Sequence, residues 1–296
     1  MQKGTCLKIT LTALSLSMAS GLWADALEFA SSISLERSDD RFGGLSAIEL
    51  DDRGDYFVAV SDRGNFVEGA ITRRDGRIVG VDFGEIKPVR KIDGNPVTSA
   101  NFDAEGLAIG SNGVAFISFE GFHRVRRYPS LDGAAENLPG HPDFQALQTN
   151  SSLEALAIDG LGRLYTVPER SGNLERPFPL YRFADGRWDR FGSIERLGEY
   201  LIAGADIGPD GKFYLLERGF RGIAFSTRIR RFSIGANGLI DGETLLISDY
   251  GRHDNLEGIS VWRDDENIIR VTLVSDDNFR FFQRTELVEY LLKPDE

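Results

Sequence analysis

Short apolar stretches alternate with turns along most of the chain. Five of them share one arrangement: an apolar strand leads through a turn containing glycine into a second apolar strand, which ends in an acidic residue. Counted from Gly44, Gly106, Ala155, Gly204 and Gly258, the repeats are 62, 49, 49 and 54 residues apart. A blade of a β-propeller usually takes about 40 to 50 residues, so this spacing predicts a propeller.

The segments between these repeats predict two more strands each. Residues 67–71 are followed by 78–83, and residues 179–183 by 187–191, with turn residues between the members of each pair. Four strands make one blade. We therefore predict an all-β fold, a single propeller of five four-stranded blades. Six blades are the alternative if the 62-residue interval contains an extra one.

The two ends of the chain complete the ring in this prediction. The fifth repeat has one apolar strand left, at 286–290, while the strand at Leu27–Ser34 belongs to no repeat. If the two pair, they complete the fifth blade. Closure also removes exposed strand edges, which would otherwise favour aggregation.

The first residues have the features of a secretory signal. Lys3 and Lys8 precede a short apolar stretch at 9–18, and Ala24 offers a small residue for cleavage. We predict a signal peptide at 1–24 and one propeller domain at 25–296, in a periplasmic or secreted protein. Cleavage there would remove Cys6, the only cysteine, so the mature chain would have neither a disulfide nor a thiol nucleophile.

Composition narrows the range of partners. Charged residues make up 27% of the chain and hydrophobic residues 41%, as in ordinary globular proteins. Asp and Glu outnumber Lys and Arg by 46 to 34, so the protein offers no general basic surface to nucleic acids. No segment resembles a membrane span of about 20 apolar residues. A small anionic ester is the partner that we expect.

Acidic residues recur at two places in the repeats. Within an antiparallel blade, the start of the first strand and the end of the second lie at the same end of the sheet. Glu105, Glu154 and Glu257 stand at the start of first strands. The acids at the ends of second strands are Asp62, Glu120, Glu169, Glu217 and Asp276.

We expect these acids to gather around one mouth of the channel. Carboxylates so close together raise one another's pKa unless cations neutralise them. A ligand set made only of oxygen favours Ca²⁺, with Mg²⁺ as the other possibility, so all eight acids are candidate metal ligands. Blade four has Ala203 and blade one has Gly43 where the others have Glu, which makes the predicted ring of acids incomplete.

A purely structural role explains some of the same residues. Three of the acids precede an arginine, so that Arg63, Arg170 and Arg218 can form salt bridges between blades. Other catalytic patterns are absent. The sequence contains no G-x-S-x-G, no H-E-x-x-H and no phosphate-binding glycine loop.

Several phrases together resemble the phytase-like family, described as having esterase-like activity of phytase. They lie at 44–48 with 61–64, at 103–108, at 152–157, at 209–211 with 216–219, and at 255–260 with 274–279. The resemblance covers nearly all of the mature chain. It implies a secreted or periplasmic bacterial propeller whose acidic residues hydrolyse phosphoric esters.

Three functions remain open from the sequence. The first is a phosphoric ester hydrolase, in which Glu105, Glu154 and Glu257 hold a divalent metal. The arginines expected to bind the phosphate oxygens are Arg63, Arg170 and Arg218. The second is a lactonase resembling gluconolactonase-like propellers, which needs no arginine cluster. The third is a binding module without catalysis.

Overall fold

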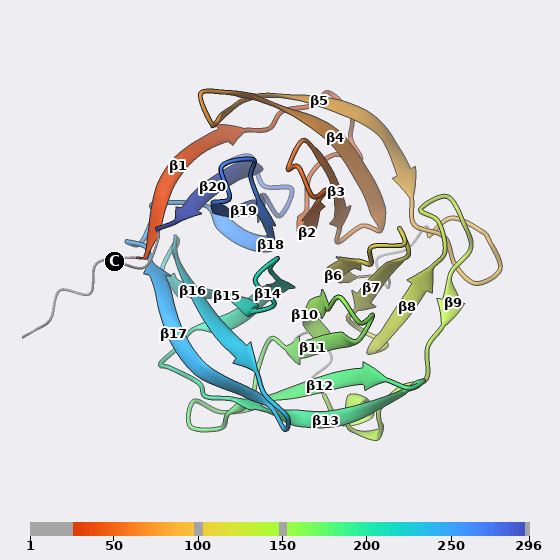
Figure 1. The fold of residues 1–296 in the computed structure, drawn as a ribbon. Coiled ribbons are helices and arrows are strands. Elements are labelled where there is room, and N and C mark those ends of the chain that lie inside the picture. Colours follow the sequence, from red (N-terminus) through yellow and green to blue (C-terminus); the bar gives the residue numbers. More distant parts are fainter. Residues whose placement is uncertain (1–25, 98–102, 148–152, 294–296) are drawn as a thin grey trace, which may run out of the picture.

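The chain folds into a ring of five four-stranded antiparallel sheets around a central channel (Figure 1). The structure is a computed structural model that describes residues 26–97, 103–147 and 153–293. The predicted all-β propeller of five blades is confirmed, and the six-bladed alternative is excluded. The predicted signal peptide at 1–24 lies outside the described residues.

Each blade runs outward from the channel in chain order. Blade one contains β2 (Leu45–Leu50), β3 (Tyr56–Ser61), β4 (Asn65–Arg74) and β5 (Arg77–Pro88). Blade two contains β6 (Ala104–Ile109), β7 (Ala115–Phe119), β8 (Arg124–Tyr128) and β9 (Glu136–Asn137). Blade three contains β10 (Leu153–Ile158), β11 (Leu164–Pro168), β12 (Phe178–Ala184) and β13 (Arg187–Ile194). Blade four contains β14 (Leu201–Ile207), β15 (Phe213–Arg221), β16 (Ala224–Ile234) and β17 (Leu239–Ile247).

Blade five joins the two ends of the chain. It contains β18 (Asn255–Arg263), β19 (Ile269–Asp276) and β20 (Glu286–Leu292), with β1 (Leu27–Ser34) outermost. β1 pairs antiparallel with β20 along its length, from Leu27 opposite Leu292 to Ser34 opposite Glu286. The predicted closure is therefore confirmed.

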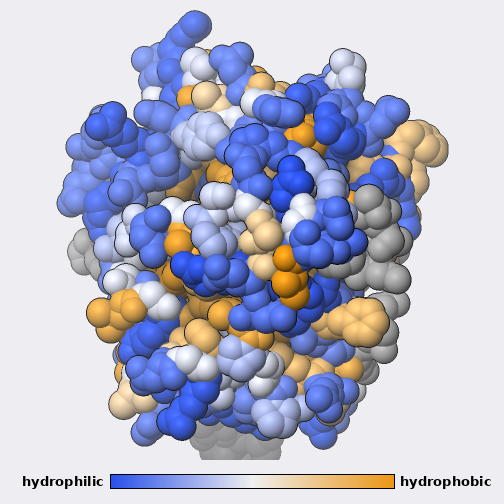
Figure 2. Space-filling model, turned by 90° about the vertical axis from the view of Figure 1, so that its right-hand side faces the viewer, coloured by the Kyte–Doolittle hydropathy of each residue, from blue (hydrophilic) through white to orange (hydrophobic). Residues whose placement is uncertain are grey.

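The blades are held together by apolar clusters between neighbouring sheets. In one cluster, Val60 and Phe66 of blade one pack with Ile117 and Phe119 of blade two. The side face in Figure 2 is mostly hydrophilic, with hydrophobic residues in small separate patches. The only helical element in the described residues is the short 3₁₀-helix η1 (Pro142–Ala146). Within this part of the chain, no helix has the length and apolar character needed to cross a membrane.

The first strand of every blade carries a β-bulge at the same place. Its pairing with the second strand shifts register once, and the shift leaves one position without a direct partner in four blades and two positions, Glu105 and Gly106, in blade two. A bulge re-aims the side chain of the extra residue. The bulged positions are Ser46, Glu105, Glu154, Ala203 and Glu257.

Only glycine or alanine follows each bulge, because the five inner strands converge there. A Cβ on Gly204 would lie 2.4 Å from the backbone oxygen of Glu257, and one on Gly106 would lie 2.7 Å from the Cβ of Leu156. In blade one this position is Ala47. Gly44, from which the repeats are counted in the sequence, lies three residues before this equivalent position. The interval of 62 residues between Gly44 and Gly106 is therefore three residues longer than the spacing of equivalent positions.

Candidate functional site

The strand register decides which residues share the acidic mouth. Just before each bulge, a residue of the first strand pairs with one near the end of the second. These pairs are Leu45 with Ser61, Ala104 with Phe119, Leu153 with Pro168, Ile202 with Glu217, and Leu256 with Ser275. The next residue of each second strand is then Asp62, Glu120, Glu169, Arg218 and Asp276.

The prediction that Glu217 belongs to the ring of acids is therefore wrong by one residue. Successive side chains of a strand point to opposite faces, so the shift places Arg218 at the ring and Glu217 on the other face. Glu217 is fully buried, and both its oxygens accept hydrogen bonds of 2.6–2.8 Å from Arg228 and Arg230. It forms a structural ion cluster within blade four.

Blade one also needs a correction. The residue equivalent to the bulged glutamates is Ser46, not Gly43. Ser46 is buried, and its hydroxyl has no hydrogen-bond partner among the residues that the structure describes. The ring of bulged positions thus contains three glutamates, a serine and, at Ala203, an alanine.

The remaining predicted acids do come together, and each influences the ionisation of others. Asp62 and Glu105 are half-buried. The buried members are Glu120, Glu154, Glu169, Glu257 and Asp276. Burial, and then repulsion from Glu154 and Glu257, raises the pKa of Glu105 well above its usual value. Burial is also the main cause of the raised pKa values of Glu154 and Glu257.

Two aspartates at the mouth have large shifts. Burial and repulsion from Asp103 raise the pKa of Asp62 to about 7. Burial and repulsion from Glu257 raise the pKa of Asp276 to about 9. At neutral pH the ionised forms of these two aspartates are therefore unfavourable unless a proton or a nearby cation neutralises their charge.

Arg218 supplies a built-in cation on one side of the ring. Its Nη2 donates to Oε1 of Glu169 at 2.8 Å, and its Nη1 donates to Glu257 and, at 3.0 Å, to Asn255. Oε1 of Glu154 lies 3.9 Å from Nη2. Burial alone would lower the pKa of Arg218, but the glutamates raise it above its usual value. Arg218 is thus a shared counter-ion of three glutamates.

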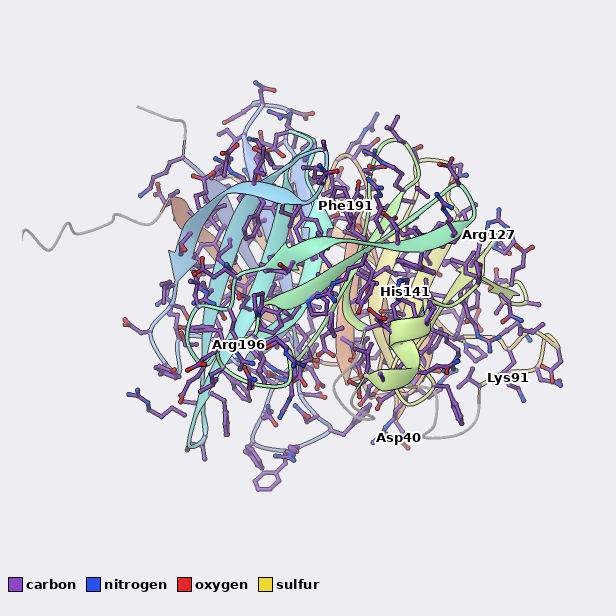
Figure 3. All side chains as sticks on the ribbon, turned by 90° about the horizontal axis from the view of Figure 1, so that it is seen from below. Asp40, Lys91, Arg127, His141, Phe191 and Arg196 are labelled. Atoms are coloured by element: carbon purple, nitrogen blue, oxygen red, sulfur yellow. The ribbon has the colours of Figure 1, made fainter. Side chains whose placement is uncertain are left out.

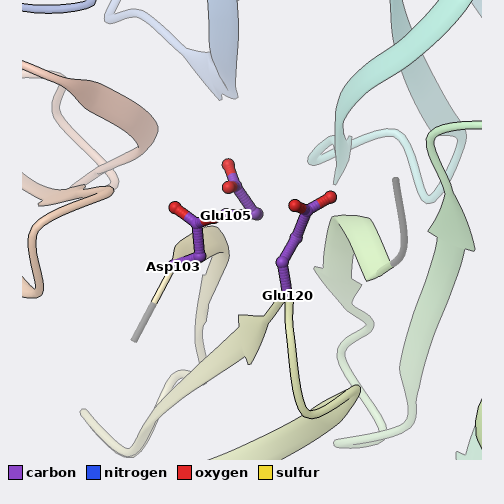
Figure 4. Close-up of side chains that lie close together, drawn as sticks. All are labelled: Asp103, Glu105 and Glu120. Carbon is purple, nitrogen blue, oxygen red and sulfur yellow. The ribbon is translucent and has the colours of Figure 1, made fainter. Parts of the chain in front are cut away.

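Three acids of blade two form a separate cluster. Asp103, Glu105 and Glu120 each offer a carboxylate oxygen, and these oxygens lie within 4.8 Å of one another (Figure 4). The backbone N–H of Glu120 donates to the carbonyl oxygen of Asp103 at 2.8 Å, which ties the two segments together. Oxygens bound to one Ca²⁺ lie about 2.3–2.6 Å from the ion, so this separation suits shared coordination.

Sequence reasoning missed Asp103 as a ligand. The signal was its place two residues before Glu105, because residues at that spacing lie on the same face of an extended segment. Among the other acids, Oδ1 of Asp62 is buried without a hydrogen-bond partner in the described part of the chain. The donor set around the mouth therefore fits a hard cation.

The other two arginines lie at the open side of the mouth. Arg170 is half exposed, and its Nε donates to Oε2 of Glu169 at 3.0 Å. Arg63 is exposed, and its guanidinium carbon lies 3.2 Å from the centre of the Phe279 ring. Both retain N–H groups that can face an incoming anion.

The channel is nearly closed below the acids. The cavity between the inner strands, lined by Ser46, Glu105, Glu154 and Glu257, measures about 10 Å³, room for about one water molecule. A larger hollow of about 1140 Å³ lies at the opposite end, where Glu49 is among its lining residues. The clustered carboxylates are at the other mouth, so we place the candidate site there.

The fold and the acidic mouth define a five-bladed propeller with a candidate metal-binding centre. The chain belongs to the phytase-like family, whose model, described as esterase-like activity of phytase, matches residues 40–279. No curated protein matches the sequence.

Similar solved structures are propellers of varied function. A gluconolactonase from Xanthomonas campestris is 16% identical, with a TM-score of 0.46, over 85% of this chain and 79% of that one. A virginiamycin B lyase from Staphylococcus aureus is 14% identical, with a TM-score of 0.43, over 82% and 70%. A protein of unknown function from Dyadobacter fermentans is 11% identical, with a TM-score of 0.48, over 89% and 87%.

Proposed function

We propose that the acidic mouth hydrolyses phosphoric esters with a divalent cation, Ca²⁺ or Mg²⁺, held by Asp103, Glu105 and Glu120. The observation that carries this proposal is the blade-two cluster itself, with its oxygens within 4.8 Å of one another. Arg218 donates its hydrogen bonds to Glu169 and Glu257, which belong to blades three and five. The acids of blade two therefore need a further cation to neutralise their charge. The family assignment supports an ester hydrolase.

The chain's own residues have distinct tasks in this proposal. A bound cation would polarise the phosphoryl oxygen and acidify a water molecule. As water forms its bond to phosphorus and the bond to the alcohol breaks, Asp62, whose pKa is raised to about 7, accepts the proton of the attacking water. The departing alkoxide takes a proton from solvent at the open mouth. Arg170 and Arg63 bind phosphate oxygens at the open side. Arg218 offsets part of the charge of Glu154, Glu169 and Glu257, and its hydrogen bonds hold Glu169 and Glu257 in place.

A metal-dependent screen tests this function. The purified protein is assayed on phosphomonoesters and phosphodiesters after treatment with a chelator and after addition of Ca²⁺ or Mg²⁺. We expect activity to disappear with chelator and return with the ion. Glu105→Gln should abolish the return, whereas Glu136→Gln, an exposed acid paired with Arg127 at the outer edge of blade two, should not affect it. Activity that persists unchanged in chelator contradicts the proposal.

A lactonase is the second candidate, and one observation favours it. The hydrogen bonds of Arg218 to carboxylates leave only Arg63 and Arg170 of the predicted phosphate-binding arginines at the open mouth. Lactone hydrolysis needs no arginine cluster. Arg170→Ala should lower phosphoesterase activity by about 10²-fold, the usual effect of losing one preorganised donor. A lactonase would keep its rate in this variant and still lose it in chelator.

Absence of turnover on every phosphoester and lactone, with or without metal, would favour the binding module.

We also propose a periplasmic or secreted location, on the basis of the basic and apolar residues at 1–24. Fractionation of cells that express the full chain tests this. A protein that keeps residues 1–24 and remains in the cytoplasm would contradict it.

A further inference from the structure

Exposed apolar side chains gather on the loops around the acidic mouth. Second strands end at this mouth, so the loops that connect them to third strands surround it. These loops, the ends of the strands beside them and the connections between blades carry Ile92, Phe122, Leu174, Leu197, Phe220, Ile223, Tyr250, Phe281 and Phe282. We call this set the apolar rim.

The most exposed rim residues lie at the tips of their loops. Phe281 is 100% exposed, Ile223 95% and Phe122 74%. Figure 3 views the ring edge-on, with loops projecting from the end at which Asp40 lies. In the loops of the opposite end, as far as the structure describes them, Leu161 is the only large hydrophobic residue that is exposed. Strand ends there carry Tyr56, Val79 and Ile240, which are 41–52% exposed, so the largest and most exposed apolar group is the one at the acidic mouth.

Arginines accompany the rim. Arg280 directly precedes Phe281, and its guanidinium lies 5.9 Å from the ring of Phe282. Arg221 lies 5.0 Å from the ring of Tyr250. Exposed arginines beside aromatic and aliphatic tips suit an anionic lipid surface, because the rings enter the headgroup region while the cations contact phosphates.

Both ends carry exposed acids, such as Glu36, Asp40 and Glu175 beside the mouth, where exposed arginines such as Arg176, Arg252 and Arg280 accompany them. In the described chain, the opposite end has fewer exposed arginines to balance its acids. Its loops include the exposed acids Asp51, Asp52, Asp265 and Glu266. The whole chain has a formal charge of −12, so an anionic surface would repel most of the molecule. With the rim toward a lipid surface, the acidic mouth would face that surface and the acids of the opposite end would lie away from it.

We propose that the apolar rim docks on an anionic lipid surface and that the substrate is a phosphoric ester with an apolar tail, presented at that surface. The substrate class rests on the proposed function, whereas the docking itself does not. The apolar side chains bind the lipid, the rim arginines contact its phosphates, and the ester enters the mouth between the loops.

Sedimentation with vesicles tests the docking without any turnover. The protein is mixed with vesicles of phosphatidylcholine alone or of phosphatidylcholine with phosphatidylglycerol. We expect binding to the anionic vesicles, and weaker binding at high salt because exposed charges are screened. Phe281→Ser combined with Phe282→Ser should weaken binding on the order of 10-fold or more, because two exposed rings no longer leave water.

The matched control is Leu161→Ser, which removes a side chain that is 79% exposed at the opposite end. It should bind vesicles like the unchanged protein. Equal binding by the double variant, or an equal loss in the control, overturns the docking. A dimer that the double variant dissociates, with no vesicle binding, would show that the rim contacts a second copy and would also overturn it.

Turnover then tests the substrate class. A short-chain and a long-chain phosphoric ester with the same headgroup are compared in the presence of Ca²⁺. We expect a faster rate on the long-chain ester in vesicles, and the double variant should lose this advantage while keeping its rate on the short ester. Equal rates on both esters overturn the substrate class. Vesicle binding with no hydrolysis of any ester would contradict the proposed function and leave the docking intact.

Discussion

The two sides of the acidic ring neutralise their charge in different ways. On the side of blade four, Arg218 contacts Glu169 and Glu257 directly and lies near Glu154. On the side of blade two, Asp103, Glu105 and Glu120 converge on one another. One repeated position therefore supplies a cation in blade four and an acid in the other blades.

This difference shows how a repeat protein can build an asymmetric site on a symmetric frame. A fully acidic ring would repel itself throughout. With Arg218 in one blade, part of the negative charge of the ring is offset by the protein itself, and the need for an external cation is greatest at blade two and the aspartates beside it. The following experiments test this division.

The largest effect should appear in the pH dependence of stability. The pKa of Asp62 is raised from 3.8 to about 7 and that of Asp276 from 3.8 to about 9, so the folded protein holds protons that the unfolded chain releases. Metal-free stability should therefore fall as pH rises from about 4 to 9, in total on the order of 10 kcal/mol. Denaturant unfolding at several pH values measures it. Saturating Ca²⁺ should flatten the curve, and a curve unchanged by Ca²⁺ would show that the ion does not neutralise the ring.

Loss of the built-in cation should be the next largest effect. Arg218→Met keeps much of the side-chain volume but leaves buried glutamates without their partner, which should cost about 3 kcal/mol at pH 8. The loss should be smaller at pH 5, because the glutamates take up protons. Arg170→Met removes a half-exposed arginine and should cost less than about 1 kcal/mol. Equal losses in both variants would contradict the central role of Arg218.

The same substitution should have opposite effects on the two sides. Glu169→Gln removes a charged partner of Arg218 and should destabilise the protein by about 1–3 kcal/mol. Glu105→Gln removes a charge that its neighbours repel, so it should stabilise the metal-free protein by about 1 kcal/mol. Denaturant unfolding in chelator compares the two variants. Calorimetric titration should show that the Glu105→Gln variant has lost most of its affinity for Ca²⁺. If both variants changed the free energy of unfolding in the same direction, the proposed difference between the two sides of the ring would be wrong.

The smallest effect concerns the uncharged position of blade one. The buried hydroxyl of Ser46 has no partner in the described structure, so Ser46→Ala should stabilise the protein slightly, by up to about 1 kcal/mol. Metal affinity should change less than twofold. A large loss of Ca²⁺ affinity in titration would instead make Ser46 part of the site.

The sequence by itself determined the repeat, the blade count and the closure. Alternation of apolar and polar residues fixes strands, and the spacing of the Gly and Ala positions fixes a blade period. The strands left over at 286–290 and Leu27–Ser34 could only be placed together. The chain order of strands also sufficed to bring most of the predicted acids to one mouth, because antiparallel neighbours alternate in direction.

Only the tertiary structure decided the register. The Glu217-Arg218 pair looks like the Asp62-Arg63 and Glu169-Arg170 pairs, so the sequence favours the acid as the ring residue. A shift of one residue exchanges the faces of a strand. Burial of Glu217 against Arg228 and Arg230, two strand residues of β16, fixes the opposite assignment. Such partners come from a neighbouring strand, and local sequence similarity contains no information about them.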